Sequence, residues 1–277
     1  MADAEWTWRA ELNDLLRACR SRRAGPAVPG SRRSGLRQED VANLAGLSVR
    51  RYAALERGEF TPPPGMVDQV ASALQMSEAE RSALHVLAAG QDPPRPVTRP
   101  VDESAPEPSS SLRDLVTQIG PYPSALTDET WSLLYYNQAM SAWSGGWYDR
   151  ANPRDRNLMC YLFTKDAESL LPDVRALRRF SVAAWRYQYT RNLSSPRFSD
   201  LITRLIGRND EAAALWALHE LVIPPHEYPV RARHPDHGVI DIGVVCVPVR
   251  PRLWLYSMVV PPGVEPFLIR QGETPGH

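Results

Sequence analysis

Apolar residues recur at helical spacing over most of the first ninety positions, which predicts a helical N-terminal domain. In residues 6–23 they fall three and four apart, so one face of a helix would carry them. Residues 65–75 repeat the pattern, and a further helix follows Ser77, which has the spacing of a capping box with Glu80. The expected core positions of these helices are Leu12, Leu15, Leu16, Cys19, Met66, Val67, Val70, Ala71, Leu74, Leu84, Leu87 and Ala88.

Residues 36–58 predict two short helices that meet at a tight turn. Val41, Leu44 and Ala45 lie three and four positions apart and form an apolar stripe on the first of them. Gly46 follows, where a helix can end in the left-handed conformation that glycine adopts at little cost. Ser48 is expected to cap the second helix by accepting a hydrogen bond from a backbone N–H.

The second of these helices is expected to present small and basic side chains to solvent. Tyr52 and Leu55 lie three positions apart and face the core together. A short helix whose other face carries arginines suits the major groove of DNA. The outward residues are Arg50, Arg51, Ala54 and Arg57.

This stretch resembles the helix-turn-helix of Xre-type, phage-repressor-like regulators. The matching residues are Gln38, Ala42, Gly46, Ser48, Tyr52 (usually Ile or Val), Leu55, Glu56 and Gly58. An ordinary helical hairpin is the alternative, and the joint agreement of these positions argues against it. The resemblance implies a five-helix DNA-binding domain in which Gln38 contacts phosphate and Val49, Arg50 and Arg51 face base edges. The DNA-binding residues expected in all are Arg32, Arg33, Arg37, Gln38, Ser48, Val49, Arg50, Arg51 and Ala54.

Positive charge is concentrated around this motif. The chain has a formal net charge of +0, yet residues 17–57 contain ten arginines against three acidic residues. Contacts to DNA phosphates need such an excess, although Arg32 and Arg33 could also belong to a solvated basic loop. By the same resemblance Arg20 is expected to pair with Glu56, the alternative being a solvated surface arginine.

A proline-rich segment separates this region from a second one with a mixed pattern. Residues 91–110 contain six prolines and almost no large apolar side chains, which predicts an extended linker. Helices and short strands alternate after it. Residues 239–249 are apolar at both parities and predict a central strand covered on both faces. The expected strands are 124–127, 130–136, 227–233, 239–249 and 252–260.

Motifs in the second region resemble those of MmyB-like regulators. They are Tyr136-Asn137, the run from Arg156 to Phe163, Trp185-Arg186, Trp216 with His219, and His234-Pro235 with Gly238. The resemblance covers nearly the whole chain and implies a PAS-like domain, in which helices cup a sheet around an apolar cavity. Tyr136 and Trp185 differ from the residues usual in the family at expected cavity positions. The ligand is therefore expected to differ from that of relatives.

A ligand cavity needs an apolar wall and a few placed polar groups. Some MmyB-like domains accommodate a fatty acid, so the resemblance implies an amphipathic acid whose carboxylate meets Arg186. Three alternatives stay open: the aromatic residues fill the core, Arg186 forms an internal salt bridge, and His219 binds a backbone carbonyl. The expected ligand-binding residues are Trp131, Tyr135, Asn137, Trp143, Phe163, Trp185, Arg186, Tyr189, Trp216 and His219.

Other classes of function find little support in the sequence. The three cysteines, Cys19, Cys160 and Cys246, form no C-x-x-C pair and are interpreted as small buried hydrophobic residues. His234 and His237 lie in a predicted hairpin turn without a third ligand at a fitting spacing, so no metal is expected. Phosphate-binding glycine loops and nucleophile motifs are missing, and neither an enzyme nor a cofactor is expected.

No apolar run approaches the ~18 residues of a membrane span, and a cytoplasmic location is expected. The many arginines beside a single lysine hint at a GC-rich bacterial genome.

The sequence thus predicts a multidomain regulator. Residues 1–90 are expected to form an all-α five-helix Xre-type helix-turn-helix domain, 91–110 a linker, 111–265 an α+β PAS-like ligand-binding domain, and 266–277 a tail. The protein would bind double-stranded operator DNA as a homodimer and sense a small apolar or amphipathic ligand. The alternative is a protein-interaction module that the DNA-binding domain tethers, with no small-molecule ligand.

Overall fold

The computed structural model describes residues 2–23, 35–88, 106–193 and 195–264 of the 277-residue chain. Their packing forms two compact units, one from residues 1–100 and 182–223 and the other from 101–181 and 224–277. Helix α11 (Val174–Thr190) contributes its first half to the second unit and its remainder to the first. Most of the predicted linker, the C-terminal tail, and the loop with Arg32 and Arg33 lie outside the described residues.

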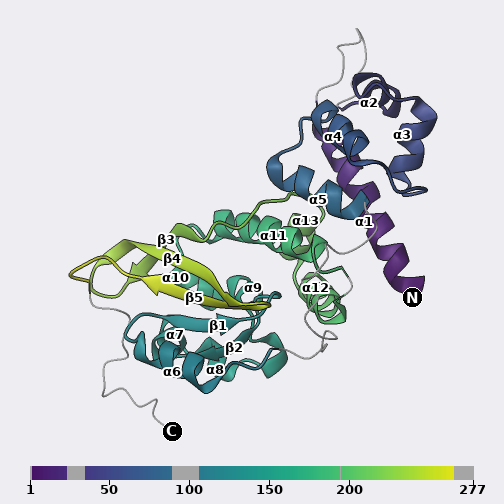
Figure 1. Ribbon diagram of the computed structural model, residues 1–277. Coiled ribbons are helices and arrows are strands. Elements are labelled where there is room, and N and C mark those ends of the chain that lie inside the picture. Colours follow the sequence, from purple (N-terminus) through teal and green to yellow (C-terminus); the bar gives the residue numbers. More distant parts are fainter. Residues whose placement is uncertain (1, 24–34, 89–105, 194, 265–277) are drawn as a thin grey trace. The chain divides into compact units, whose positions relative to one another are not determined.

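The N-terminal part of the first unit consists of the five predicted helices (Figure 1). Their apolar stripes meet in one core, which also receives Tyr187 and Leu221 from the later part of the chain. The helices of the first unit besides α11 are α1 (Ala2–Arg22), α2 (Gln38–Leu44), α3 (Val49–Glu56), α4 (Pro64–Ala73), α5 (Glu78–Ala88), α12 (Pro196–Arg208) and α13 (Asp210–Trp216).

The turn between α2 and α3 has the predicted construction. Gly46 adopts φ +65°, and the Ser48 hydroxyl accepts a hydrogen bond of 3.3 Å from the backbone N–H of Arg51. Leu44 differs from the prediction, because 55% of it is exposed. The buried arc of the seven-residue helix α2 is filled by Val41 and its neighbours Ala42 and Ala45, and Leu44 lies beyond the edge of that arc.

Glu56 joins helix α3 to the rest of the first unit. Its side chain is 1% exposed, and its Oε1 lies 3.0 Å from Nη2 of Arg20, as predicted. The amide of Gln38 donates to Oε2 at 3.2 Å, and the amide of Asn13 donates to the Glu56 backbone carbonyl at 3.0 Å. Helices α1, α2 and α3 are thus fastened together at one residue.

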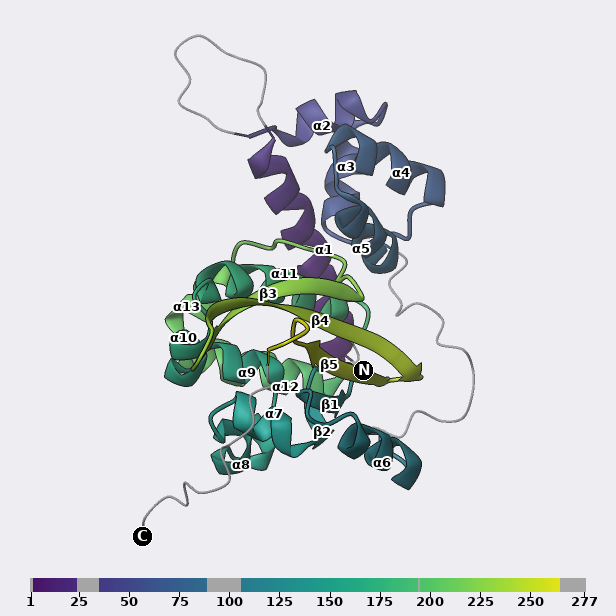
Figure 2. The ribbon, with the colours of Figure 1, turned by 90° about the vertical axis from the view of Figure 1, so that its left-hand side faces the viewer.

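The second unit is built on a five-stranded antiparallel sheet of order β2-β1-β5-β4-β3 (Figure 2). The strands are β1 (Ser124–Thr127), β2 (Leu133–Tyr136), β3 (Glu227–His234), β4 (Gly238–Arg250) and β5 (Leu253–Val259). The short helices between them are α6 (Ser110–Gln118), α7 (Gln138–Trp143), α8 (Trp147–Arg150), the 3-10 helix η1 (Pro153–Asp155), α9 (Leu158–Leu162) and α10 (Lys165–Leu170).

Residues 239–249 form an internal strand of the sheet, as predicted, but the predicted burial on both faces is wrong. Strand β5 occupies the middle of the sheet, and β4 lies beside the edge strand β3. Ile242 and Val244 of β4 are buried in the helix-covered core, whereas the alternate positions stay partly or fully exposed, with Val239 47% exposed. Apolar residues at both parities therefore do not establish burial on both faces, since burial depends on which elements cover the sheet.

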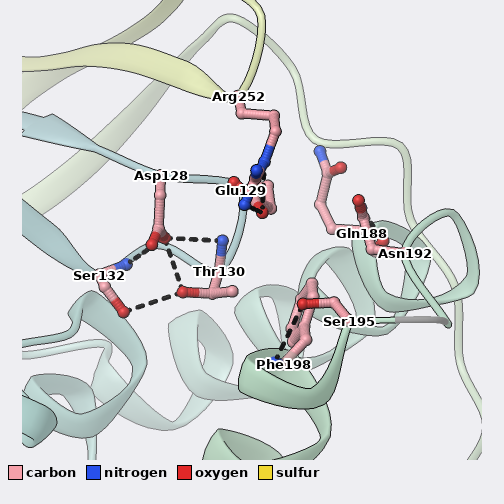
Figure 3. A network of polar contacts seen from close by, with 9 residues as sticks. All are labelled: Asp128, Glu129, Thr130, Ser132, Gln188, Asn192, Ser195, Phe198 and Arg252. Carbon is pink, nitrogen blue, oxygen red and sulfur yellow. Dashed lines mark hydrogen bonds and ion pairs between the residues drawn. The ribbon is translucent and has the colours of Figure 1, made fainter. Parts of the chain in front are cut away.

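The turn between β1 and β2 carries a buried polar network (Figure 3). The Asp128 carboxylate accepts hydrogen bonds from the backbone N–H of Thr130 at 2.9 Å and of Ser132 at 3.1 Å, and from the Thr130 hydroxyl at 2.6 Å. Beside it, Oε1 of the buried Glu129 lies 2.7 Å from Nη2 of Arg252. Because residues 128–132 form this network, strand β2 begins at Leu133, three residues after the predicted start.

Replacing Glu56 with Ala should lower the melting temperature of the first unit, because it leaves Arg20 without its buried partner. Breaking such a pair from one side costs on the order of 3–5 kcal/mol. Thermal unfolding of the full chain, followed by circular dichroism at a helical wavelength, measures the effect.

The matched control for this experiment is Glu59→Ala, which removes an exposed acid that pairs with Arg57. Its melting should stay close to that of the unaltered protein. Equal melting of the Glu56 variant and the unaltered protein would show that the pair does not hold α3 in place.

Candidate functional site

The outer face of α3 gathers the residues predicted to read DNA. Ser48, Val49, Arg50 and Arg51 are all exposed at the start of the helix, and Ala54 is half-buried one turn later. Tyr52, Leu55 and Glu56 are buried on the opposite face of the helix. This packing fixes the backbone from which the two arginine side chains extend. An exposed arginine side chain on such a helix can place its planar guanidinium against the edge of a guanine base.

Four predicted phosphate contacts precede this helix, and two of them, Arg37 and Gln38, lie among the described residues. Arg37 is exposed and pairs with Glu39 at 3.1 Å, an interaction at the surface that DNA could replace at little cost. Gln38 is half-buried, and its amide is already engaged by Glu56. Arg32 and Arg33 lie outside the described residues.

The second unit contains an apolar pocket where the start of α11 faces the edge strand β3. Its volume is about 390 Å³, within the range of ~300–1,000 Å³ usual for small-molecule sites. The rings of Phe180 and Tyr228 lie 5.6 Å apart in its wall. Burial raises the pKa of Tyr228 to about 12, so its hydroxyl stays neutral. The lining residues are Leu171, Asp173, Ala176, Leu177, Phe180, Tyr228, Pro229, Val230, Arg231 and Asp241.

Charged groups of this pocket are linked by an exposed ion pair. Nε of Arg231 lies 2.5 Å from Oδ2 of Asp173, and Nη2 lies 2.7 Å from Oδ1. The hydrogen bonds hold the pKa of Asp173 below its usual value and raise the pKa of Arg231. Both groups therefore remain charged at neutral pH.

None of the ten residues predicted to bind ligand is among those that line this pocket. Five of them belong to the second unit, where they serve its turns and core. Asn137 is buried and caps α7, accepting from the backbone N–H of Met140 at 3.0 Å and donating to the carbonyls of Val116 and Tyr122. The other four are placed as follows: Trp143 in the core, Tyr135 bonded to Thr117, Phe163 beneath the guanidinium of Arg178, and Trp131 half-buried at φ +63°.

The remaining five predicted residues belong to the first unit. Trp185, Tyr189 and Trp216 are brought together, with ring centroids of Trp216 at 6.1 Å from Trp185 and 5.8 Å from Tyr189. Phe198 of α12 completes the cluster against Trp185 and Tyr189. These contacts agree with the alternative that the aromatic residues fill a core.

Arg186 forms the internal salt bridge that the sequence left open as an alternative. Its Nη1 lies 2.8 Å from Oε2 of Glu11 on α1, its Nη2 donates to the Trp216 carbonyl at 2.6 Å, and its guanidinium lies 3.9 Å from the Trp216 ring. Burial lowers the pKa of Arg186 and raises that of Glu11, while their mutual attraction opposes both shifts. This pair ties α11 to α1 across 175 positions of sequence.

Histidine side chains in the described part of the chain belong to no group that could hold a metal ion. Burial lowers the pKa of His219, which adopts φ +52° after α13. The rings of His234 and His237 are 4.7 Å apart at the β3–β4 turn, but no group of three or more possible metal ligands occurs among the described residues.

The three cysteines differ in burial. Cys19 is buried, whereas Cys160 and Cys246 are only half-buried, contrary to prediction. Burial raises the pKa of Cys19 to about 12 and of Cys246 to about 11, which leaves both thiols protonated at neutral pH.

The residues that line the pocket were not predicted from the sequence, although their spacing gave a weak indication that they share a face. Leu177 and Phe180 lie three apart at the start of α11, and Tyr228 and Val230 alternate along β3. Both patterns are typical of any core face, and only their meeting in space distinguishes them.

Comparisons with known families agree with this arrangement. Residues 11–84 match the family described as helix-turn-helix domain, and residues 108–266 match the MmyB-like transcription regulator ligand binding domain. No curated protein matches the chain. None of the described helices has the length and apolarity to cross a membrane. With a DNA-binding motif in one region and a ligand-binding family over more than half of its length, the chain belongs to the MmyB-like transcription regulators.

Proposed function

We propose that this regulator is a one-component sensor, in which occupancy of the pocket beside β3 changes operator binding by α3. The ligand is a small apolar or amphipathic molecule, and the family resemblance makes a fatty acid the first expectation. The protein acts as a homodimer on a partly palindromic operator in the cytoplasm, without enzymatic activity of its own. Two half-sites about one helical turn apart would match such a dimer.

The observation that carries this proposal is the course of helix α11. Leu177 and Phe180 in its first half line the pocket. Six residues after Phe180, Arg186 is held by Glu11 on α1. Helix α1 also contributes Arg20 and Asn13 to the Glu56 network that orients α3. A displacement of α11 by ligand would therefore reach the recognition helix through paired side chains, which a mere tether would not require.

Arg50→Ala should reduce the preference of the protein for its operator over unrelated DNA by roughly 1–3 kcal/mol, the value of one bidentate arginine–guanine contact. Operator fragments are first selected from random DNA with the unaltered protein. Dissociation constants for selected and scrambled fragments are then compared at one salt concentration.

Arg57→Ala is the matched control, because it removes the same charge at the exposed end of α3. It should weaken binding to both fragments about equally, through the lost phosphate attraction. An undiminished preference in the Arg50 variant would remove that residue from base recognition.

Ala176→Trp should fill the pocket from its rim, where Ala176 is exposed, and should leave the core of the second unit intact. Binding of decanol, a neutral probe, is expected to weaken by about tenfold or more, measured by isothermal titration calorimetry. Ser169→Trp places the same ring at an exposed position of α10 that does not line the pocket, and should bind like the unaltered protein. Unchanged decanol binding in the Ala176 variant would place the ligand elsewhere.

The double variant Glu11→Leu with Arg186→Met should uncouple ligand from DNA. Replacing both partners with apolar residues avoids a lone buried charge and keeps the fold. Decanol should still bind, but the change that it causes in the operator dissociation constant should shrink toward none. A fully retained effect would contradict the proposed route through α11, and Glu78→Gln on the exposed face of α5 serves as the control.

A further inference from the structure

We infer that the pocket beside β3 selects an amphipathic ligand with a cationic head group, such as an alkyl- or arylammonium, over the corresponding carboxylate. The inference rests on the proposed function, because it names the ligand class of the same pocket. It also departs from the fatty acid that the family resemblance implies.

The body of the pocket accepts an apolar chain or ring. Leu171, Leu177 and Val230 contribute aliphatic surface. Phe180 and Tyr228 add two aromatic faces inclined at 51° to each other. Aromatic faces carry negative potential and attract a cation that passes near them, whereas they offer no such attraction to an anion.

The charged residues of the lining decide the sign of the head group. Arg231 is the only cation among the residues that line this pocket, and both of its contacting nitrogens already face the Asp173 carboxylate. A ligand carboxylate would have to share Arg231 with Asp173 or displace it. The neighbouring Arg175 and Arg179 of α11 are not part of the lining.

Asp241 gives the lining its excess of negative charge. It stands directly opposite Arg231 in the β3–β4 ladder, so two carboxylates flank one guanidinium. The three charged residues sum to one negative charge. An ammonium group would neutralise this excess, whereas a carboxylate would double it.

The other arginine expected to receive a ligand carboxylate is already engaged. Arg186 is held by the Glu11 carboxylate, the Trp216 carbonyl and the Trp216 ring, as described above. It does not line the pocket. The described residues around the pocket therefore favour a cationic head.

The test compares three probes of equal chain length on the full-length protein: decylamine, which is an ammonium at neutral pH, decanol and decanoate. Calorimetric titrations are run at low ionic strength and below the micelle concentrations. The dissociation constant of the ammonium should be roughly three- to tenfold lower than that of decanoate, since exposed charge pairs have modest strength. Added salt should reduce the difference.

Asp241→Asn should remove most of this difference, measured as the ratio of the dissociation constants of decylamine and decanoate. Glu227→Gln is the matched control, because it removes one exposed acid from the same strand pair without altering the lining. It should retain the preference. The Ala176→Trp variant shows in parallel that each probe occupies the pocket.

Each other outcome overturns the inference in a recognisable way. Tighter binding of decanoate, or a preference that survives Asp241→Asn, refutes the assigned head group. Equal binding of the three probes, all weakened by Ala176→Trp, refutes the head group and leaves the pocket and the proposed function standing. Failure of all three probes to bind refutes the pocket together with the inference.

Discussion

The buried carboxylate of Glu56 is the constraint on which the position of helix α3 in the helix-turn-helix depends. An ion at 1% exposure is stable in a protein only when its charge and its lone pairs are satisfied. Arg20 and Gln38 satisfy them here from two different helices. The outer face of α3 is therefore oriented by contacts on the opposite, buried side of the helix.

Helix α1 forms polar contacts of the same kind with two other helices of the first unit. Glu11 receives Arg186, while Asn13 and Arg20 reach Glu56. The apolar stripe of α1 packs in the core of this unit, so a shift of α1 would also shift the side chains packed against it. Two ionic contacts on one helix thus connect the segment after residue 182 to helix α3.

The sequence specified those features that depend on neighbours in the chain. Local spacing predicted the Gly46 turn, the Ser48 cap and strands β3, β4 and β5. The Arg20–Glu56 pair was predicted from the family resemblance. Leu44 and strand β4 were misjudged because periodicity shows which side chains share a face, not what covers that face. The pocket beside β3 was missed, and the role of Arg186 stayed undecided, because each depends on residues far apart in sequence.

The division of the chain by packing differs from its division by family. The ligand-binding family extends over 108–266, yet residues 182–223 pack in the unit that contains the helix-turn-helix. Exchange of the first hundred residues between relatives would place a foreign α1 against Arg186. The ion pair with Arg186 would then form only if the foreign helix also carried an acid at position 11.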